Sequence, residues 1–255
     1  SPFTKKSITV SKKDNEINTL RKYIESGSDE CLSPTAINTY LNCPLRFYFS
    51  YIAGLDEYDE VTEEIDPALF GSILHKAINI IYEPHIDSRI NKDILNNIIK
   101  DKNIVESAID EAFRCEYFRD NTGKKKPEIT GRNLIIKEVI NKYVNQILVV
   151  DRLYSPFKVI SLEKFYTSQI PVVICNKNEK VNIGGKIDRI DEKDGKLRII
   201  DYKTGQTKNS FKSIDALFDN KGSERNISAF QTLLYSLIHS DNNKKDIIPG
   251  LYFMR

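Results

Sequence analysis

The chain has 255 residues, enough for one large domain, and its 40% hydrophobic and 29% charged residues are typical of a soluble globular protein. No run approaches about 18 apolar residues, which excludes a membrane-spanning helix, and the first residues lack the apolar core of a signal peptide. Because the net charge is only +2, any basic surface for nucleic acid must be local.

The N-terminal part is predicted to hold an arm followed by two short helices. Residues 1–30 are polar and weakly patterned, so we expect an arm or linker there, with at most a short helix over residues 19–26. Ser33-Pro34 supplies the N-cap and first position of a helix. Cys43-Pro44 interrupts that helix, and a second one runs on to Gly54, a typical residue just past a helix end.

A longer helix is predicted from Asp66-Pro67, again a cap followed by a first-turn proline. Gly71 and His75 lie one turn apart on the same face of this helix. The missing side chain at Gly71 would let the helix lie close to a sheet. A lone helical histidine is most often an ordinary surface or core residue, so the spacing alone does not make His75 a ligand.

The region from 91 to 150 also shows helical periodicity. We expect three helices there, over residues 94–99, 105–118 and 134–149. The loop between the last two helices contains Lys124, Lys125 and Lys126. Two interpretations of this basic run stay open: it contacts DNA phosphates, or it is only a solvated loop.

From Phe157 the hydrophobic period changes to two, which predicts strands. We expect strands over residues 157–166 and 169–175 and a turn over residues 177–180. The next stretch, IGGKIDRIDEKDGKLRIIDYKTG over residues 183–205, predicts a β-hairpin, because Asp-Gly is a strong signal for a two-residue turn.

The hairpin register follows from the turn at Asp194-Gly195. It places Asp188 opposite Asp201 on one face of the sheet, and Lys203 lies two residues further on that face. Two facing carboxylates among isoleucines are destabilising unless positive charge lies between them. A divalent cation and a lysine would meet that need, although a plain polar hairpin is the alternative interpretation of the spacing.

The last predicted elements are a helix from Ile227 to His239, capped by Asn226, and a strand over residues 247–254. Gln231 and Tyr235 lie one turn apart on the helix. The chain stops inside the strand, so we expect it to be a domain of a longer protein.

These motifs resemble the metal-binding core of the PD-(D/E)XK nucleases. The resemblance is closest to the RecB-like branch, which includes the nuclease domains of the AddA and AddB subunits. It rests on GGKIDRID followed by IIDYKTG, on the G-x-x-x-H of the Gly71 helix and on the Q-x-x-x-Y of the last helix. The resemblance implies that Asp188, Asp201 and Lys203 are catalytic. It also implies that His75, Asp188, Asp201 and the Tyr202 carbonyl bind Mg²⁺ or Mn²⁺.

Further roles follow from the same resemblance. Glu163 would be an upstream acidic residue that supports the metal site, and Gln231 and Tyr235 would contact DNA. The segment over residues 32–55 resembles the opening of these domains, and Cys43 matches an iron–sulfur ligand of the AddB branch. The four cysteines are scattered, and none follows Cys175, so we expect no iron–sulfur cluster in this chain, a reducing cytoplasm, and a buried structural role for Cys43.

The fold implied is α/β, with the αβββαβ core of restriction endonucleases: a mixed central sheet flanked by helices, with an N-terminal and inserted helical region. The domain would span residues 31–255, with its helical part over about 31–150 and its sheet core, apart from the His75 helix, over about 155–255.

The function expected is a metal-dependent, exonuclease-type deoxyribonuclease in DNA recombination and repair, within a larger helicase–nuclease protein or beside a helicase subunit. Two alternatives stay open: a non-catalytic DNA-binding module that keeps the fold, and a scaffold that docks a helicase subunit.

Overall fold

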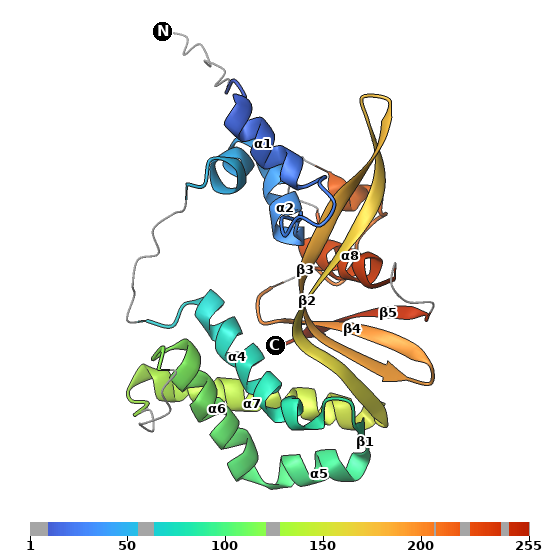
Figure 1. Cartoon of the computed structure of the whole chain (residues 1–255). Coiled ribbons are helices and arrows are strands. Elements are labelled where there is room, and N and C mark those ends of the chain that lie inside the picture. The colour runs from blue at the N-terminus through green and yellow to red at the C-terminus, as the bar shows by residue number, and fades with distance from the viewer. Residues whose placement is uncertain are drawn as a thin grey trace.

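The computed structural model describes residues 10–55, 64–120, 128–206, 208–219, 225–240 and 245–254. The chain folds into a sheet with helices on both sides (Figure 1). The helices are α1 (Asp14–Lys22), α2 (Pro34–Asn42), α3 (Pro44–Phe47), the π-helix η1 (Tyr48–Ile52), α4 (Pro67–Tyr82), α5 (Lys92–Lys100), α6 (Lys102–Glu116), α7 (Arg132–Tyr154) and α8 (Ile227–Ser240), with 3-10 turns η2 (Glu83–His85) and η3 (Asp215–Phe218). The strands are β1 (Arg89–Ile90), β2 (Phe157–Ile174), β3 (Lys177–Lys193), β4 (Lys196–Lys203) and β5 (Ile247–Phe253).

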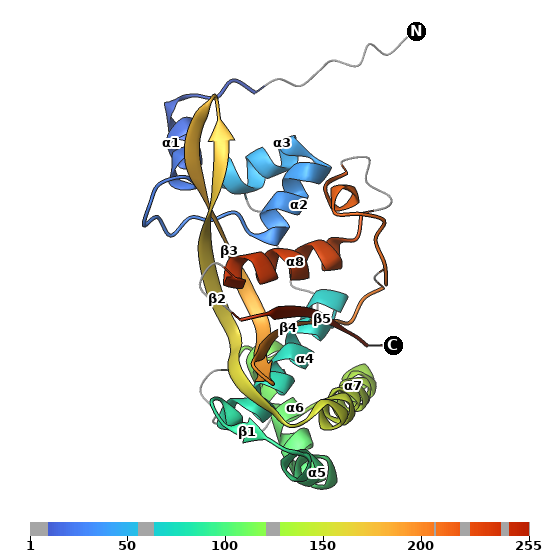
Figure 2. The same cartoon turned by 90° about the vertical axis from the view of Figure 1, so that its right-hand side faces the viewer.

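The five strands lie in sequence order across one sheet. The pairs from β1 to β4 are antiparallel, whereas β4 and β5 run parallel. Helices α4 to α7 build one apolar core against β2 and β4, and α8 packs a second core against β3 and β4. Figure 2 shows α8 and the α4–α7 group on opposite sides of the sheet. The predicted fold class, a mixed sheet flanked by helices, is confirmed.

The helix starts follow the predicted caps. The Ser33 hydroxyl accepts from Ala36 N–H at 3.1 Å, the Asp66 carboxylate from Leu69 N–H at 2.7 Å, and the Asn226 carbonyl from Ala229 N–H at 2.9 Å. The short N-terminal helix starts earlier than the sequence predicts: α1 begins at Asp14, where Glu16 accepts from Lys13 N–H at 3.0 Å.

The long β2–β3 ribbon differs from the prediction. Residues 157–166 and 169–175 form one continuous strand, β2, because Thr167 and Ser168 pair with Gly184 and Ile183 as ordinary strand residues. The turn lies at Cys175-Asn176, where both residues have positive φ, so the residues predicted as a turn already belong to β3.

The β3–β4 hairpin has the predicted register. Its pairs run from Lys193–Lys196 to Arg189–Ile200, and Asp194 and Gly195 both have positive φ, as a type I′ turn requires. This turn sets where the chemistry-bearing residues at the far end of the hairpin lie.

The prediction that Cys43 is buried is wrong. The residue is exposed, and its Sγ accepts from Arg46 N–H at 3.5 Å, so the thiol caps α3. Lys124, Lys125 and Lys126 lie outside the described residues. Among the described helices, none has a segment long and apolar enough to cross a bilayer.

Candidate metal centre

The site begins at Asp188, where strand pairing is interrupted on both sides. Toward β2, the pairs Leu162–Arg189 and Lys164–Ile187 flank a gap, and Glu163 has a positive φ of 47° there. Toward β4, the ladder ends at Arg189–Ile200. Asp188 instead accepts from Tyr202 N–H at 2.9 Å through its side chain. The interruption therefore turns the carboxylates of Glu163 and Asp188 away from regular sheet geometry.

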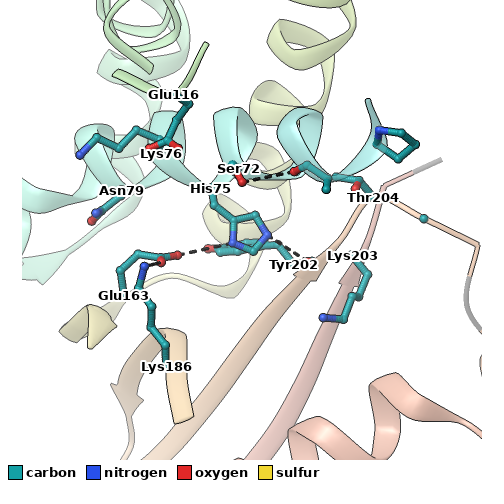
Figure 3. A pocket seen from close by; sticks show the side chains of 14 residues that line it. Ser72, His75, Lys76, Asn79, Glu116, Glu163, Lys186, Tyr202, Lys203 and Thr204 are labelled. Atoms are coloured by element: carbon teal, nitrogen blue, oxygen red, sulfur yellow. Dashed lines mark hydrogen bonds and ion pairs between the residues drawn. The ribbon is translucent and has the colours of Figure 1, made fainter. Parts of the chain in front are cut away.

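His75 reaches these carboxylates from α4. Its Nδ1 lies 3.4 Å from Glu163 Oε1 and 3.5 Å from Asp188 Oδ2, and its Nε2 lies 3.1 Å from the Tyr202 carbonyl oxygen (Figure 3). In the neutral ring, a proton on Nε2 donated to Tyr202 leaves the Nδ1 lone pair facing the two acids. The carbonyl thus selects the tautomer in which His75 is suited to ligate a metal.

The charges at the site are not balanced internally. Burial disfavours the charged imidazole, but the hydrogen bond to Glu163 and the charges of Asp188 and Glu163 outweigh it and raise the pKa of His75 to about 9. Burial raises the pKa of Asp188 to about 7, opposed by His75 and assisted by the charge of Asp201. The pKa of Asp201 is also raised by burial, which the charge of Lys203 opposes.

Lys203 is held on the α8 side of the site. Its ammonium donates to Asp201 Oδ1 at 3.0 Å and to Gln231 Oε1 at 3.1 Å. Asp201 Oδ2 lies 2.8 Å from the same nitrogen, but off the hydrogen-bond direction, and has no hydrogen-bond donor among the described residues. The predicted pairing of Asp201 with Lys203 on one face is therefore present, with Asp201 only 1% exposed.

Gln231 and Tyr235 form a chain behind Lys203. The Gln231 amide donates to the Tyr235 hydroxyl at 3.0 Å while its oxygen accepts from Lys203. Tyr235 is 5% exposed, and a Cβ at Gly185 would come within 2.6 Å of its ring. A direct DNA contact by Tyr235 would require uncovering the ring; in this structure the residue orients Gln231, and Gln231 orients Lys203.

A cavity of about 490 Å³ opens in front of His75, Glu163 and Lys203. Lys186 also lines it and pairs with Glu163 Oε2 at 2.5 Å, with its side chain 59% exposed. Gly71 borders the cavity too, but a Cβ there would lie 3.7 Å from Thr204 Oγ1, an ordinary contact. The proximity of α4 to the sheet therefore does not depend on the absence of a side chain at Gly71.

The donor set fits a hard divalent cation. His75, Glu163 and Asp188 each offer one ligand atom, and these atoms lie within 4.8 Å of one another. Ligands at right angles around Mg²⁺ are about 3 Å apart, close to the 3.4 and 3.5 Å distances from His75 Nδ1. Carboxylate and imidazole ligands suit Mg²⁺ or Mn²⁺. Asp201 and the Tyr202 carbonyl border this group without belonging to it, and Glu163 belongs to it.

The sequence analysis missed a second cluster directly behind the site. Arg189 is completely buried and bonds Asp151 twice at 2.7 Å, Asp191 at 3.0 Å and the Tyr202 hydroxyl at 2.9 Å. The available signal was the run of charged residues in the strand IDRIDE, whose isoleucines mark it as buried.

Comparison with known proteins agrees with this geometry. The family model of the PD-(D/E)XK nuclease superfamily matches residues 31–253. The AddB subunit of the ATP-dependent helicase/deoxyribonuclease of Carboxydothermus hydrogenoformans is 28% identical over 237 residues, which is 88% of this chain and 20% of the relative. Its counterpart in Clostridium perfringens strain SM101 is 27% identical over 224 residues, which is 81% of this chain and 18% of the relative.

The chain therefore spans a fifth or less of the length of these two relatives. Both relatives agree with the AddB-type, RecB-like resemblance of the motifs, and the family model covers both the α4 histidine and the β3–β4 hairpin. On these grounds the chain belongs to the PD-(D/E)XK nuclease superfamily.

Proposed function

We propose that the chain is a Mg²⁺- or Mn²⁺-dependent deoxyribonuclease that hydrolyses phosphodiester bonds from DNA ends in recombination and repair. The observation that carries the proposal is the convergence of His75, Glu163 and Asp188 within 4.8 Å beside an ammonium group fixed by Asp201 and Gln231. A nuclease site needs a cation, a means to orient water, and positive charge near phosphorus, and this arrangement offers groups for all three.

The residues divide the chemistry between them. His75, Glu163 and Asp188 would hold the cation, with Asp201 and the Tyr202 carbonyl beside them; when bound, the cation polarises a phosphate oxygen. Lys203 orients the attacking water and stabilises the negative charge that develops at phosphorus. Its two bonds, to Asp201 and Gln231, hold the ammonium in one direction. Lys186 gives the cavity a second ammonium for phosphate.

The substrate and partners follow from the relatives. These are subunits of ATP-dependent helicase/deoxyribonucleases, so we propose that this chain acts as the nuclease part of such a protein, on DNA that a helicase delivers. Gln231, Lys124, Lys125 and Lys126 remain proposed DNA contacts, the lysines through phosphate charge.

The test is cleavage of end-labelled linear DNA and covalently closed DNA, each single- and double-stranded, with Mg²⁺, Mn²⁺ or a chelator. We expect metal-dependent loss of linear substrates and survival of closed circles. Cleavage of closed circles would refute the exonuclease assignment. DNA binding without cleavage in any metal would favour the non-catalytic module, and metal-independent co-purification with a helicase would favour the docking scaffold.

A further inference from the structure

A buried ion-pair network lies against the back of the proposed metal centre. It contains two acids, Asp151 and Asp191, and two arginines, Arg189 and Arg198, so its formal charges cancel. Asp151, Asp191 and Arg189 are completely buried, and Arg198 is 8% exposed. The network joins α7, which carries Asp151, to strands β3 and β4.

Three tyrosine hydroxyls complete the network. Tyr82 of α4 donates to Asp151 at 2.6 Å, and Tyr252 of β5 donates to Asp151 at 2.7 Å and accepts from Arg198 at 3.0 Å. Tyr202 of β4 accepts from Arg189 at 2.9 Å. The guanidinium of Arg189 also lies 4.8 Å from the centre of the Tyr82 ring. The hydroxyls and rings therefore fix four elements around one buried guanidinium.

Tyr202 is the residue through which this network meets the site. Its side chain accepts from Arg189, its backbone N–H donates to Asp188 at 2.9 Å, and its carbonyl faces His75 Nε2 at 3.1 Å. The backbone pairing of β3 with β4 ends at Arg189–Ile200, so it does not fix Tyr202 relative to Asp188. The Arg189 contact anchors the side chain of the one residue whose backbone touches two proposed ligands.

We propose that Arg189 is a positioning residue of the metal centre, and that its bond to the Tyr202 hydroxyl holds the Tyr202 backbone where it orients His75 and Asp188. This inference rests on the proposed function, because it assigns a role toward the cation. Groups behind the ligands commonly control metal affinity by fixing the orientation of the ligands.

A matched pair of variants tests the proposal. Tyr202→Phe removes the hydroxyl that accepts from Arg189 and leaves the ring and backbone in place. Tyr252→Phe removes a hydroxyl from the same network, with two hydrogen bonds, but its backbone touches no proposed ligand. We expect Tyr202→Phe to weaken Mn²⁺ binding, measured by calorimetry without DNA, by about tenfold. Tyr252→Phe should bind Mn²⁺ like the parent even where its thermal midpoint falls further.

A second readout needs no metal. The ring nitrogens of the three histidines are resolved by ¹⁵N NMR, and we expect the parent and Tyr252→Phe to show His75 with Nε2 protonated and hydrogen-bonded, and Tyr202→Phe to show altered His75 signals. Equal Mn²⁺ affinities and identical His75 signals in the two variants would overturn the positioning role. If the parent binds no Mn²⁺, the proposed function fails, and the His75 signals alone decide whether Arg189 positions this ring.

Discussion

Two buried charge clusters meet at consecutive residues of β3, Asp188 and Arg189, and they are opposite in character. In the network around Arg189, acids and bases pair: burial alone would raise the pKa of Asp151, but the charge of Arg189 and its hydrogen bonds outweigh it and lower that pKa. In the site around Asp188, three carboxylates share one imidazole and two ammonium groups, and burial raises the pKa of Asp188 to about 7. Similar burial therefore gives opposite shifts, and the difference marks which cluster is complete without a cation.

Removing one acid from each cluster should separate them most strongly. Asp151→Asn leaves Arg189 and Arg198 with one compensating carboxylate in a dry environment, and we expect a loss of about 3–5 kcal/mol in the free energy of unfolding. Asp188→Asn relieves the repulsion from Asp201, so metal-free stability should hold or rise. Urea unfolding in the presence of a chelator measures both. A loss in Asp188→Asn as large as that in Asp151→Asn would show that both clusters are structural.

The next largest effect concerns cleavage. Lys203→Ala and Asp201→Ala should each reduce the cleavage rate by about 10²–10³-fold or more, for different reasons. Asp201 is a proposed ligand, so raising the Mn²⁺ concentration should restore part of the rate of Asp201→Ala. Lys203 is not a ligand, so no metal concentration should rescue its variant. The measurement is the cleavage rate against Mn²⁺ concentration.

Lys196→Ala is the control for these variants. Lys196 lies on the same strand as Lys203, is exposed, and pairs only loosely with Asp246 at 3.6 Å. Its removal should leave the rate unchanged. If Lys203→Ala cleaves as fast as Lys196→Ala, Lys203 is structural and the nuclease proposal loses its charge-stabilising group.

The pH dependence distinguishes the incomplete cluster in one protein. The pKa of His75 is raised from 6.5 to about 9, so its charged form stabilises the fold fully below pH 6.5, and this stability is lost as the pH rises through 9. The pKa of Asp188 is raised from 3.8 to about 7, so its stability is present at low pH and is lost as the pH rises through 7. Metal-free thermal midpoints should therefore fall between about pH 6 and 9.

Metal binding should show the reverse trend, because the cation replaces these protons. We expect Mn²⁺ affinity to rise by up to about tenfold per pH unit for each proton displaced. Calorimetry in buffers of different ionisation enthalpy counts the protons released. An affinity that is constant from pH 6 to 9 would contradict ligation by His75 and Asp188.

Sequence alone was sufficient wherever local chemistry decides the structure. The caps at Ser33, Asp66 and Asn226 and the Asp194-Gly195 turn set element starts and the hairpin register through contacts within a few residues. It did not reveal that Glu163 joins His75 and Asp188, because that depends on an irregularity in β2 which alternation cannot encode. It also missed the Arg189 network, since Asp151 lies 38 residues away on α7 and only tertiary packing brings them together.

The smallest expected effects come from two glycines that border these elements. Gly71 lies inside α4, where alanine is favoured over glycine by about 0.5–1 kcal/mol, and the added Cβ would meet only Thr204 Oγ1, at 3.7 Å. Gly71→Ala should therefore raise the thermal midpoint slightly and leave Mn²⁺ affinity unchanged. Gly185→Ala is the contrast, because its Cβ would lie 2.6 Å from the Tyr235 ring and must displace it. We expect that variant to lose stability and, through Gln231, to disturb Lys203. Weaker Mn²⁺ binding in Gly71→Ala would mean that the glycine serves the cation site after all, and that the approach of α4, rather than the network behind it, limits how His75 reaches the carboxylates.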